Sequence, residues 1–324
     1  MVGHGQGLHR SNIWYYAVLL STGIVLEAAG YPKPGNVHRL RDFKDTRFED
    51  FLVTGLVFVP YLYRGILRGY KGIEGKKIIY GDLIYGIVDT SLKIHGGGNT
   101  CLGSSLLLVP LAVGLGKLLR DDEDFDLEEL TIASSMLVSN YSTPYDAVYL
   151  YRAVRRVKPS YIRQNDITNE YPNVWDKEFT RKLVEKNLRL WDILVYSSER
   201  DIVAKEVVEG YVKSKKTVKY IEDSLLAGLD WNEVIVRSLL VLLAYDVDTL
   251  VQRKHGVEAA KKVSEQAREI LKLRNEKFWK QLRILDEEWA SKGYNPGSTA
   301  DILATAISLY AVKHKSSLLR TINK

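Results

Sequence analysis

Long apolar segments constrain the fold of this chain more than any other feature. Residues 13–26 form one such segment, and residues 302–312 form another that is apolar on nearly every side. A helix that is apolar all round must be covered by other elements. Apolar residues recur at helical spacing along the rest of the chain, without paired alternating strands or an internal repeat. The sequence therefore predicts an all-α fold with buried central helices.

Start and stop signals divide the chain into successive helices. A capping box at Asp126 and Glu129, and a cap, proline and acid at Thr143, Pro144 and Asp146, mark two helix starts. Further helices are expected at residues 47–67, 82–92, 101–119, 176–195, 198–220, 232–255, 257–289 and 298–313. Because no clear linker separates them, we expect one large multi-helix domain over residues 11–324, preceded by a disordered tail at residues 1–10.

Composition limits the compartment and the partners. A hydrophobic share of 46% is ample for a core, and a net charge of +6 suits anionic small molecules as well as nucleic acid. The single cysteine, Cys101, excludes an internal disulfide framework and favours a reducing cytoplasm. Many Tyr, Lys, Arg and Glu residues suggest a thermophilic source. The apolar runs at 53–62, 106–119 and 234–245 are too short to span a bilayer, so we expect core helices and no membrane segment.

One short stretch after the first helix suits an anionic ligand. Pro32 and Pro34 fix the backbone on either side of Lys33, and Gly35 lets the chain turn sharply. A lysine on such a pre-set loop loses little entropy on binding an anion. The ordinary alternative is a turn with a solvated lysine.

A second candidate lies at residues 95–104, where a glycine-rich loop leads directly into an apolar helix. Backbone N–H groups at a helix start bind anions, and glycines such as Gly97 and Gly98 let a phosphate approach. Asn99 and Thr100 are placed to cap the helix and to contact a ligand. No Gly-Lys-Ser/Thr follows, so this is not a P-loop.

Four carboxylates stand at the ends of apolar helices: Glu27, Asp246, Asp248 and Asp301. A buried carboxylate must be capped, paired or bound to a cation. Capping accounts well for Asp301, which has capping-box spacing from Ser298, and poorly for Asp246 and Asp248. The candidate partners are Mg²⁺, Lys33, Arg253 and Lys254, with a set of buried salt bridges as the structural alternative.

Several motifs occur in an order and at spacings that resemble those of the triphosphoribosyl-dephospho-CoA synthase family. They are Glu27 with Tyr-Pro-Lys-Pro-Gly-Asn-Val at 31–37, Gly98-Asn-Thr with Gly103, Asp248-Thr with Arg253 and Gly256, and Asn-Pro-Gly-Ser-Thr-Ala-Asp at 295–301. Residues 143–149 with Asp146, and Arg200-Asp201 with Glu206, are similar to family segments less specifically. The resemblance implies an all-helical transferase that joins the triphosphoribosyl part of ATP to the 2′-hydroxyl of dephospho-CoA and releases adenine. The product is a prosthetic-group precursor for carrier proteins of the citrate or malonate lyase type.

The resemblance also implies a central polar cleft with assigned residues. Glu27 and Asp248 are the predicted catalytic residues, which stabilise positive charge on the ribose and take the acceptor's proton. Glu27, Asp246 and Asp248 are the predicted ligands of Mg²⁺. The predicted nucleotide-binding residues are Lys33, Gly35, Asn36, His38, Gly97, Gly98, Asn99, Thr100, Arg253, Pro296, Gly297, Ser298 and Asp301.

One departure from the family pattern keeps alternatives open. Where bacterial members have Asn-Thr-His-Lys-Gly, this chain has Asn-Thr-Cys-Leu-Gly at 99–103, so Leu102 replaces a basic residue. A divergent, archaeal-type member acting on another nucleotide-like acceptor, or hydrolysing an N-glycosidic bond, is the first alternative. The second is a non-catalytic helical protein that binds RNA through residues 213–219 and 261–283. Those runs are interleaved with acids and lack an aromatic stacking pattern, which disfavours nucleic acid. The oligomeric state is left open.

Overall fold

A computed structural model describes residues 10–121, 124–162 and 170–315, and within these ranges it contains fifteen α-helices and no strand. The all-α expectation is confirmed. The helices in the first half of the chain are α1 (Arg10–Ala29), α2 (Phe48–Lys71), α3 (Gly81–His95), α4 (Leu102–Asp121), α5 (Leu127–Tyr141), α6 (Pro144–Val157), α7 (Phe179–Glu185) and α8 (Leu190–Ser198). Those in the second half are α9 (Ile202–Val208), α10 (Val212–Leu226), α11 (Trp231–Tyr245), α12 (Thr249–His255), α13 (Val257–Leu271), α14 (Asn275–Lys292) and α15 (Gly297–His314).

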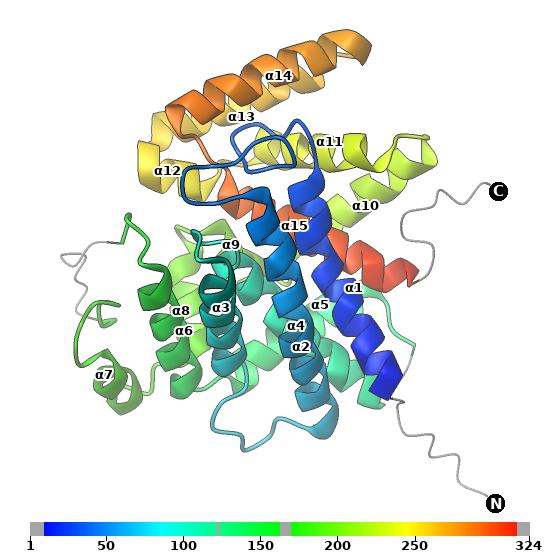
Figure 1. Ribbon diagram of the computed structural model, residues 1–324. Coiled ribbons are helices and arrows are strands. Elements are labelled where there is room, and N and C mark those ends of the chain that lie inside the picture. The colour runs from blue at the N-terminus through cyan, green and yellow to red at the C-terminus, as the bar shows by residue number, and fades with distance from the viewer. Residues whose placement is uncertain (1–9, 122–123, 163–169, 316–324) are drawn as a thin grey trace, which may run out of the picture.

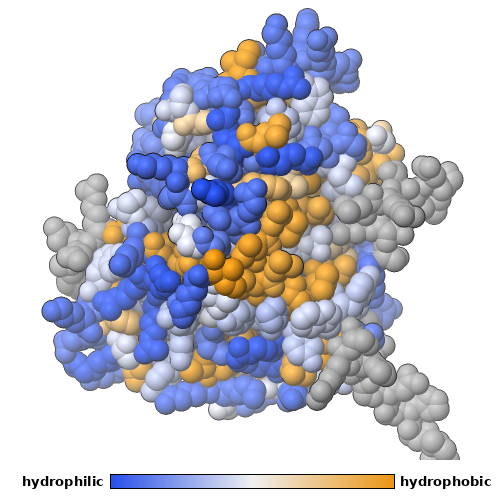
Figure 2. All heavy atoms as spheres, viewed as in Figure 1, coloured by the Kyte–Doolittle hydropathy of each residue, from blue (hydrophilic) through white to orange (hydrophobic). Residues whose placement is uncertain are grey.

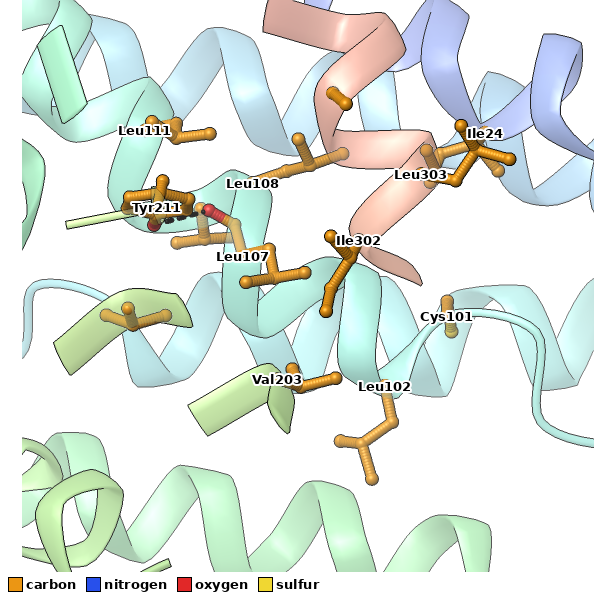
Figure 3. Packing of buried hydrophobic residues seen from close by; sticks show 14 of the residues in the cluster. Ile24, Cys101, Leu102, Leu107, Leu108, Leu111, Val203, Tyr211, Ile302 and Leu303 are labelled. Atoms are coloured by element: carbon orange, nitrogen blue, oxygen red, sulfur yellow. Dashed lines mark hydrogen bonds between the residues drawn. The ribbon is translucent and has the colours of Figure 1, made fainter. Parts of the chain in front are cut away.

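Helices α1, α2, α4 and α15 pack against one another to form the centre of the molecule (Figure 1). Helices α4 and α15 are buried along most of their length, as expected for helices without a polar face. Figure 3 shows Leu107 and Leu108 of α4 in the same buried cluster as Ile302 of α15. Gly23 allows α1 to lie directly on α15, since a Cβ there would collide with the Ala304 carbonyl oxygen.

The remaining helices surround this centre. Helices α6 to α9 lie to the left of α4, and α11 to α14 lie above it (Figure 1). Both capping signals are confirmed: the Asp126 carboxylate accepts from the Glu129 N–H, and the Thr143 hydroxyl accepts from the Asp146 N–H. The expected tail at residues 1–10 lies outside the described residues except for Arg10, which begins α1.

The structure divides four of the expected long helices into two shorter helices each. The 176–195 segment is divided between α7 and α8 near Asn187, and the 198–220 segment between α9 and α10 at Gly210 and Tyr211. Asn187 and Tyr211 have left-handed φ values of 51° and 62°, which residues other than glycine rarely adopt. The 232–255 and 257–289 segments are likewise divided, into α11 with α12 and α13 with α14. Tyr211 is held by tertiary contact, because its buried hydroxyl donates to the Leu107 carbonyl at 2.8 Å (Figure 3).

Three helices are long and apolar enough to cross a membrane when judged by length and composition alone: Asn12–Ala29, Phe48–Lys71 and Leu102–Asp121. The expectation that the apolar runs are too short was wrong for two of the segments, because the helices extend well beyond the runs at 53–62 and 106–119. In the helix Leu102–Asp121, 78% of the apolar stretch is buried inside the protein. Figure 2 shows an apolar patch on the viewed face in the region of α1 and α2, where Trp14, Val18 and Leu56 are exposed. The cytoplasmic location and the thermophilic source stay predictions.

Candidate active site

A cavity of about 150 Å³ lies where three segments distant in sequence meet: the end of α1 with its following loop, the start of α4, and the start of α15. Nine of the predicted site residues line it: Glu27, Lys33, Asn36, Asn99, Thr100, Arg253, Gly297, Ser298 and Asp301. The sequence-based assignment missed other lining residues, among them Thr46, Ser104, Tyr161, Asp201 and Asn295. Asp201 carried a signal, because it belongs to one of the weaker family-like segments.

Lys33 is a buried partner of Glu27 rather than a solvated loop lysine. Its ammonium donates to the Glu27 carboxylate and, at 2.9 Å, to the Glu27 carbonyl. Both side chains are almost fully buried. Burial raises the pKa of Glu27 and lowers that of Lys33, against their mutual attraction. The salt-bridge alternative from the sequence is therefore realised at this pair.

The loop that carries Lys33 is fixed from α14. The buried Asp286 carboxylate accepts from the Gly35 N–H at 3.3 Å, lies 3.1 Å from His38 Nε2, and accepts from the Arg41 guanidinium at 3.2 Å. Gly35 has a φ of 71°, and a Cβ there would collide with the Tyr294 carbonyl oxygen. Gly35 and His38, predicted to bind nucleotide, do not line the cavity. Gly35 and His38 instead contact the Asp286 carboxylate.

The start of α4 lines the cavity through residues 101–104. The Asn99 side chain caps the helix by accepting from the N–H groups of Cys101 and Leu102 at 3.2 and 3.0 Å. Gly97 and Gly98 do not line the cavity, because the loop that precedes α2 lies against them. A Cβ on Gly97 would meet the Asp50 carboxylate. The role of these two glycines is close backbone packing, which corrects their predicted contact with phosphate.

Asp301 faces the start of α4 from the second turn of α15. It accepts from the Ser104 hydroxyl, and Gly103 makes this approach possible, since a Cβ there would collide with the carboxylate. The expected capping box with Ser298 is wrong: α15 begins at Gly297, its N-cap is Pro296, and no side chain caps it. Pro296 itself does not line the cavity.

Burial gives Asp301 a perturbed acidity. It raises the pKa of Asp301 to about 7, against the effect of the Ser104 hydrogen bond. The negative charges of Glu27 and Asp201 act in the same direction as burial. Within the described parts of the chain, no ion pair joins Asp301. Asp301 is therefore a carboxyl group that can exchange a proton near neutral pH.

Asp248 and Asp246, predicted to bind metal, lie outside the cavity. The buried Asp248 carboxylate caps α12 through the N–H groups of Leu250 and Val251, both at 2.9 Å, and holds Thr299 of α15 through its N–H and hydroxyl. Asp246 is partly exposed and pairs with Lys213. Glu27, Asp246 and Asp248 are thus not assembled into one cluster. Across residues 10–121, 124–162 and 170–315, no group of three or more His, Cys, Asp or Glu side chains is arranged to hold a metal ion.

Arg253 and Asp201 form the far wall. Arg253 donates to Asp201 at 2.6 Å and lies over the Tyr161 ring at 4.8 Å. Asp201 also caps α9 by accepting from the Val203 N–H at 2.8 Å. The Arg253 Nε atom is buried and has no hydrogen-bond partner among the described residues. Arg253 itself lines the cavity, so its guanidinium charge can attract an anionic group that enters.

These features define a class of protein: an all-helical enzyme whose small polar cavity combines helix N-termini and a guanidinium for an anion with carboxylates for charge and proton transfer. The family model for ATP:dephospho-CoA triphosphoribosyl transferase matches residues 13–319. The chain belongs to this family, and triphosphoribosyl transfer from ATP to dephospho-CoA is the activity that membership supports.

The fold is shared with a solved structure. A crystal structure from Archaeoglobus fulgidus, assigned provisionally as a triphosphoribosyl-dephospho-CoA synthase, aligns with a TM-score of 0.58 and 22% sequence identity. The alignment covers 81% of this chain and 98% of that one. At this identity the likeness concerns the fold alone. A comparison with curated proteins gives no match.

Proposed function

We propose that the cavity described above is the place where this chain transfers the 5-triphosphoribosyl group of ATP to the 2′-hydroxyl of dephospho-CoA, with release of adenine. One observation carries the proposal. The start of α4, the Arg253 guanidinium and the Asp301 carboxylate, which come from segments far apart in the chain, line a single cavity. An anionic substrate, a developing positive charge and a proton can all be accommodated there.

The phosphates of ATP are assigned to the start of α4. Asn99 already accepts from the N–H groups of Cys101 and Leu102, but Gly103 also lines the cavity, and the helix dipole favours negative charge there. Lys33 contributes indirectly, because its charge is already committed to Glu27. This proposal replaces the expectation that Lys33 holds the phosphates directly.

Asp301 is assigned as the general base. Its pKa of about 7 leaves a substantial ionised fraction at neutral pH, and the carboxylate can accept the proton of the acceptor hydroxyl as the new bond to C1′ forms. The Ser104 hydroxyl orients the carboxylate. Glu27 and Asp201 line the same cavity and stabilise the positive charge that develops on the ribose as adenine departs.

We retain Mg²⁺ as the proposed companion of the triphosphate. The donor set fits this role, because Mg²⁺ is commonly held by one or two carboxylates together with substrate phosphates. Asp201, which lines the same cavity, is the carboxylate we propose to hold it, so that Asp301 stays free to accept a proton. When bound, Mg²⁺ would neutralise phosphate charge.

Incubation with Mg-ATP and dephospho-CoA tests the proposal by the release of free adenine. We expect adenine only when both substrates are present, and its loss in Asp301→Asn. Asp223→Asn on α10 is the matched control, because its carboxylate is exposed and does not line the cavity. Adenine release from ATP without any acceptor would favour N-glycosidic hydrolysis. Release with another acceptor but not with dephospho-CoA would favour a different transferase.

A further inference from the structure

A second cavity of about 530 Å³ opens beside the first. The two cavities share Leu102, Leu106, Tyr161, Asp201 and Arg253 as lining residues. Helices α6, α8 and α9 supply much of the remaining wall. The second cavity is larger than the first and lies within the range of volumes that bind small molecules.

The wall of the second cavity is mostly uncharged. Aliphatic side chains such as Leu150, Val154 and Ile193 line it together with tyrosines. The polar tip of Tyr151 is already engaged, because its hydroxyl donates to the Pro172 carbonyl at 2.9 Å. Tyr171 and Tyr196 stack on one another with ring centroids 4.3 Å apart. Such a wall offers apolar and aromatic contact to a ligand and little to hold a charge.

Charge is concentrated at the junction of the two cavities. Arg253 and Asp201 form their ion pair there, and Arg200 also lines the second cavity. Leu102 lies at the same junction, with its side chain directed away from Cys101 and Ile302 (Figure 3). A ligand that fits both regions has an anionic part at Arg253 and an uncharged part in the larger cavity.

We propose that the second cavity binds the uncharged arm of the acceptor while its diphosphate lies at Arg253. This inference rests on the proposed function, since the acceptor must reach the first cavity with its 2′-hydroxyl. Dephospho-CoA has the required chemistry: an adenosine, a diphosphate, and a long neutral arm with amide groups. The apolar Leu102 at the junction suits the passage of such an arm better than a basic residue would.

The test compares dephospho-CoA with ADP, which has the same adenosine and diphosphate but no arm. Affinity for each is measured by calorimetry, without turnover. We expect the wild-type protein to bind dephospho-CoA at least about tenfold more tightly than ADP, since burial of two methylene groups suffices for that factor. Equal affinities would overturn the proposal.

A filled cavity sharpens the comparison. Ser197 of α8 lines only the second cavity, so Ser197→Trp should reduce the preference to near one by weakening dephospho-CoA alone. Val195→Trp is the matched control, because Val195 is on the same helix, is 42% exposed and lines neither cavity. If Ser197→Trp does not fold, Tyr196→Ala removes part of the wall instead and should weaken dephospho-CoA but not ADP.

The outcomes separate this inference from the proposed function. If Ser197→Trp weakens dephospho-CoA and ADP equally, the second cavity binds a part that the two molecules share. If it weakens ATP binding, the second cavity belongs to the donor substrate. Either result overturns the proposal. A preference for dephospho-CoA that Ser197→Trp abolishes, without any release of adenine, would support the arm site and refute the transferase activity.

Discussion

Replacement of Lys33 by methionine should destabilise the protein by about 3–5 kcal/mol, because it leaves the Glu27 carboxylate buried without a cation. The side chains of Lys33 and Glu27 are only 1% and 5% exposed, so solvent screens the pair little. Methionine keeps most of the lysine volume, which separates the loss of charge from the loss of packing. The double variant Glu27→Gln/Lys33→Met should recover most of the stability, because no isolated charge remains.

Thermal unfolding measures this difference. An unfolding entropy of about 2.1 cal/mol/K per residue makes 1 kcal/mol equivalent to about 1.5 °C for a chain of 324 residues. Lys33→Met should therefore lower Tm by about 4–7 °C. Without Lys33, the pKa of Glu27 rises further above its ordinary value of 4.5, since burial is no longer opposed. A carboxyl whose folded pKa is raised favours folding more as the pH falls, so the deficit should shrink as the pH is lowered toward 4.5.

A Tm of Lys33→Met within 1 °C of the wild type, together with weaker ATP binding, would refute this reasoning. Lys33 would then be a ligand-facing lysine, as the sequence alone suggests. A deficit that does not depend on pH would instead point to lost packing, because a titrating Glu27 could not produce it.

Three further predictions concern the carboxylates and the metal. The pH profile of kcat/KM should fall below a pH of about 7 as Asp301 is protonated. Ser104→Ala should move this limb to higher pH, because the Ser104 hydrogen bond lowers the pKa of Asp301 and its removal raises that pKa. A limb that does not move would show that another group titrates. Asp248→Asn should lower stability by at least about 1–2 kcal/mol in denaturant unfolding, since an amide cannot accept all the hydrogen bonds to α12 and Thr299; unchanged stability would remove its structural role. Mg²⁺ and ATP together should raise Tm by more than the sum of their separate effects, and equal stabilisation by ATP in excess EDTA would contradict a metal-bridged site.

Local signals in the sequence located helix starts better than helix breaks. The Asp126 and Thr143 caps are formed within four residues of chain, so their partners are visible in the sequence. The break at Tyr211 is different, because a tyrosine gives no sign of a left-handed φ. It is stabilised by a hydrogen bond to Leu107, 104 residues away. Breaks of this kind depend on tertiary contacts, and the apolar pattern continues through them.

The same distinction separates the roles of Asp248 and Asp301. Sequence spacing suggests that Asp301 is a cap and that Asp248 needs a cation, and the structure reverses both roles. Asp248 is satisfied by two N–H groups of its own helix and by Thr299, 51 residues away. Asp301 lies beyond the first turn of α15 and meets Ser104 of α4, 197 residues away. A sequence motif shows that a carboxylate lies near the start of a helix. Whether hydrogen bonds within the protein satisfy that carboxylate or leave it available for proton transfer depends on the neighbouring helices. In this chain Gly103 allows α4 to approach Asp301 closely, and Asp301 lines the cavity whereas Asp248 does not.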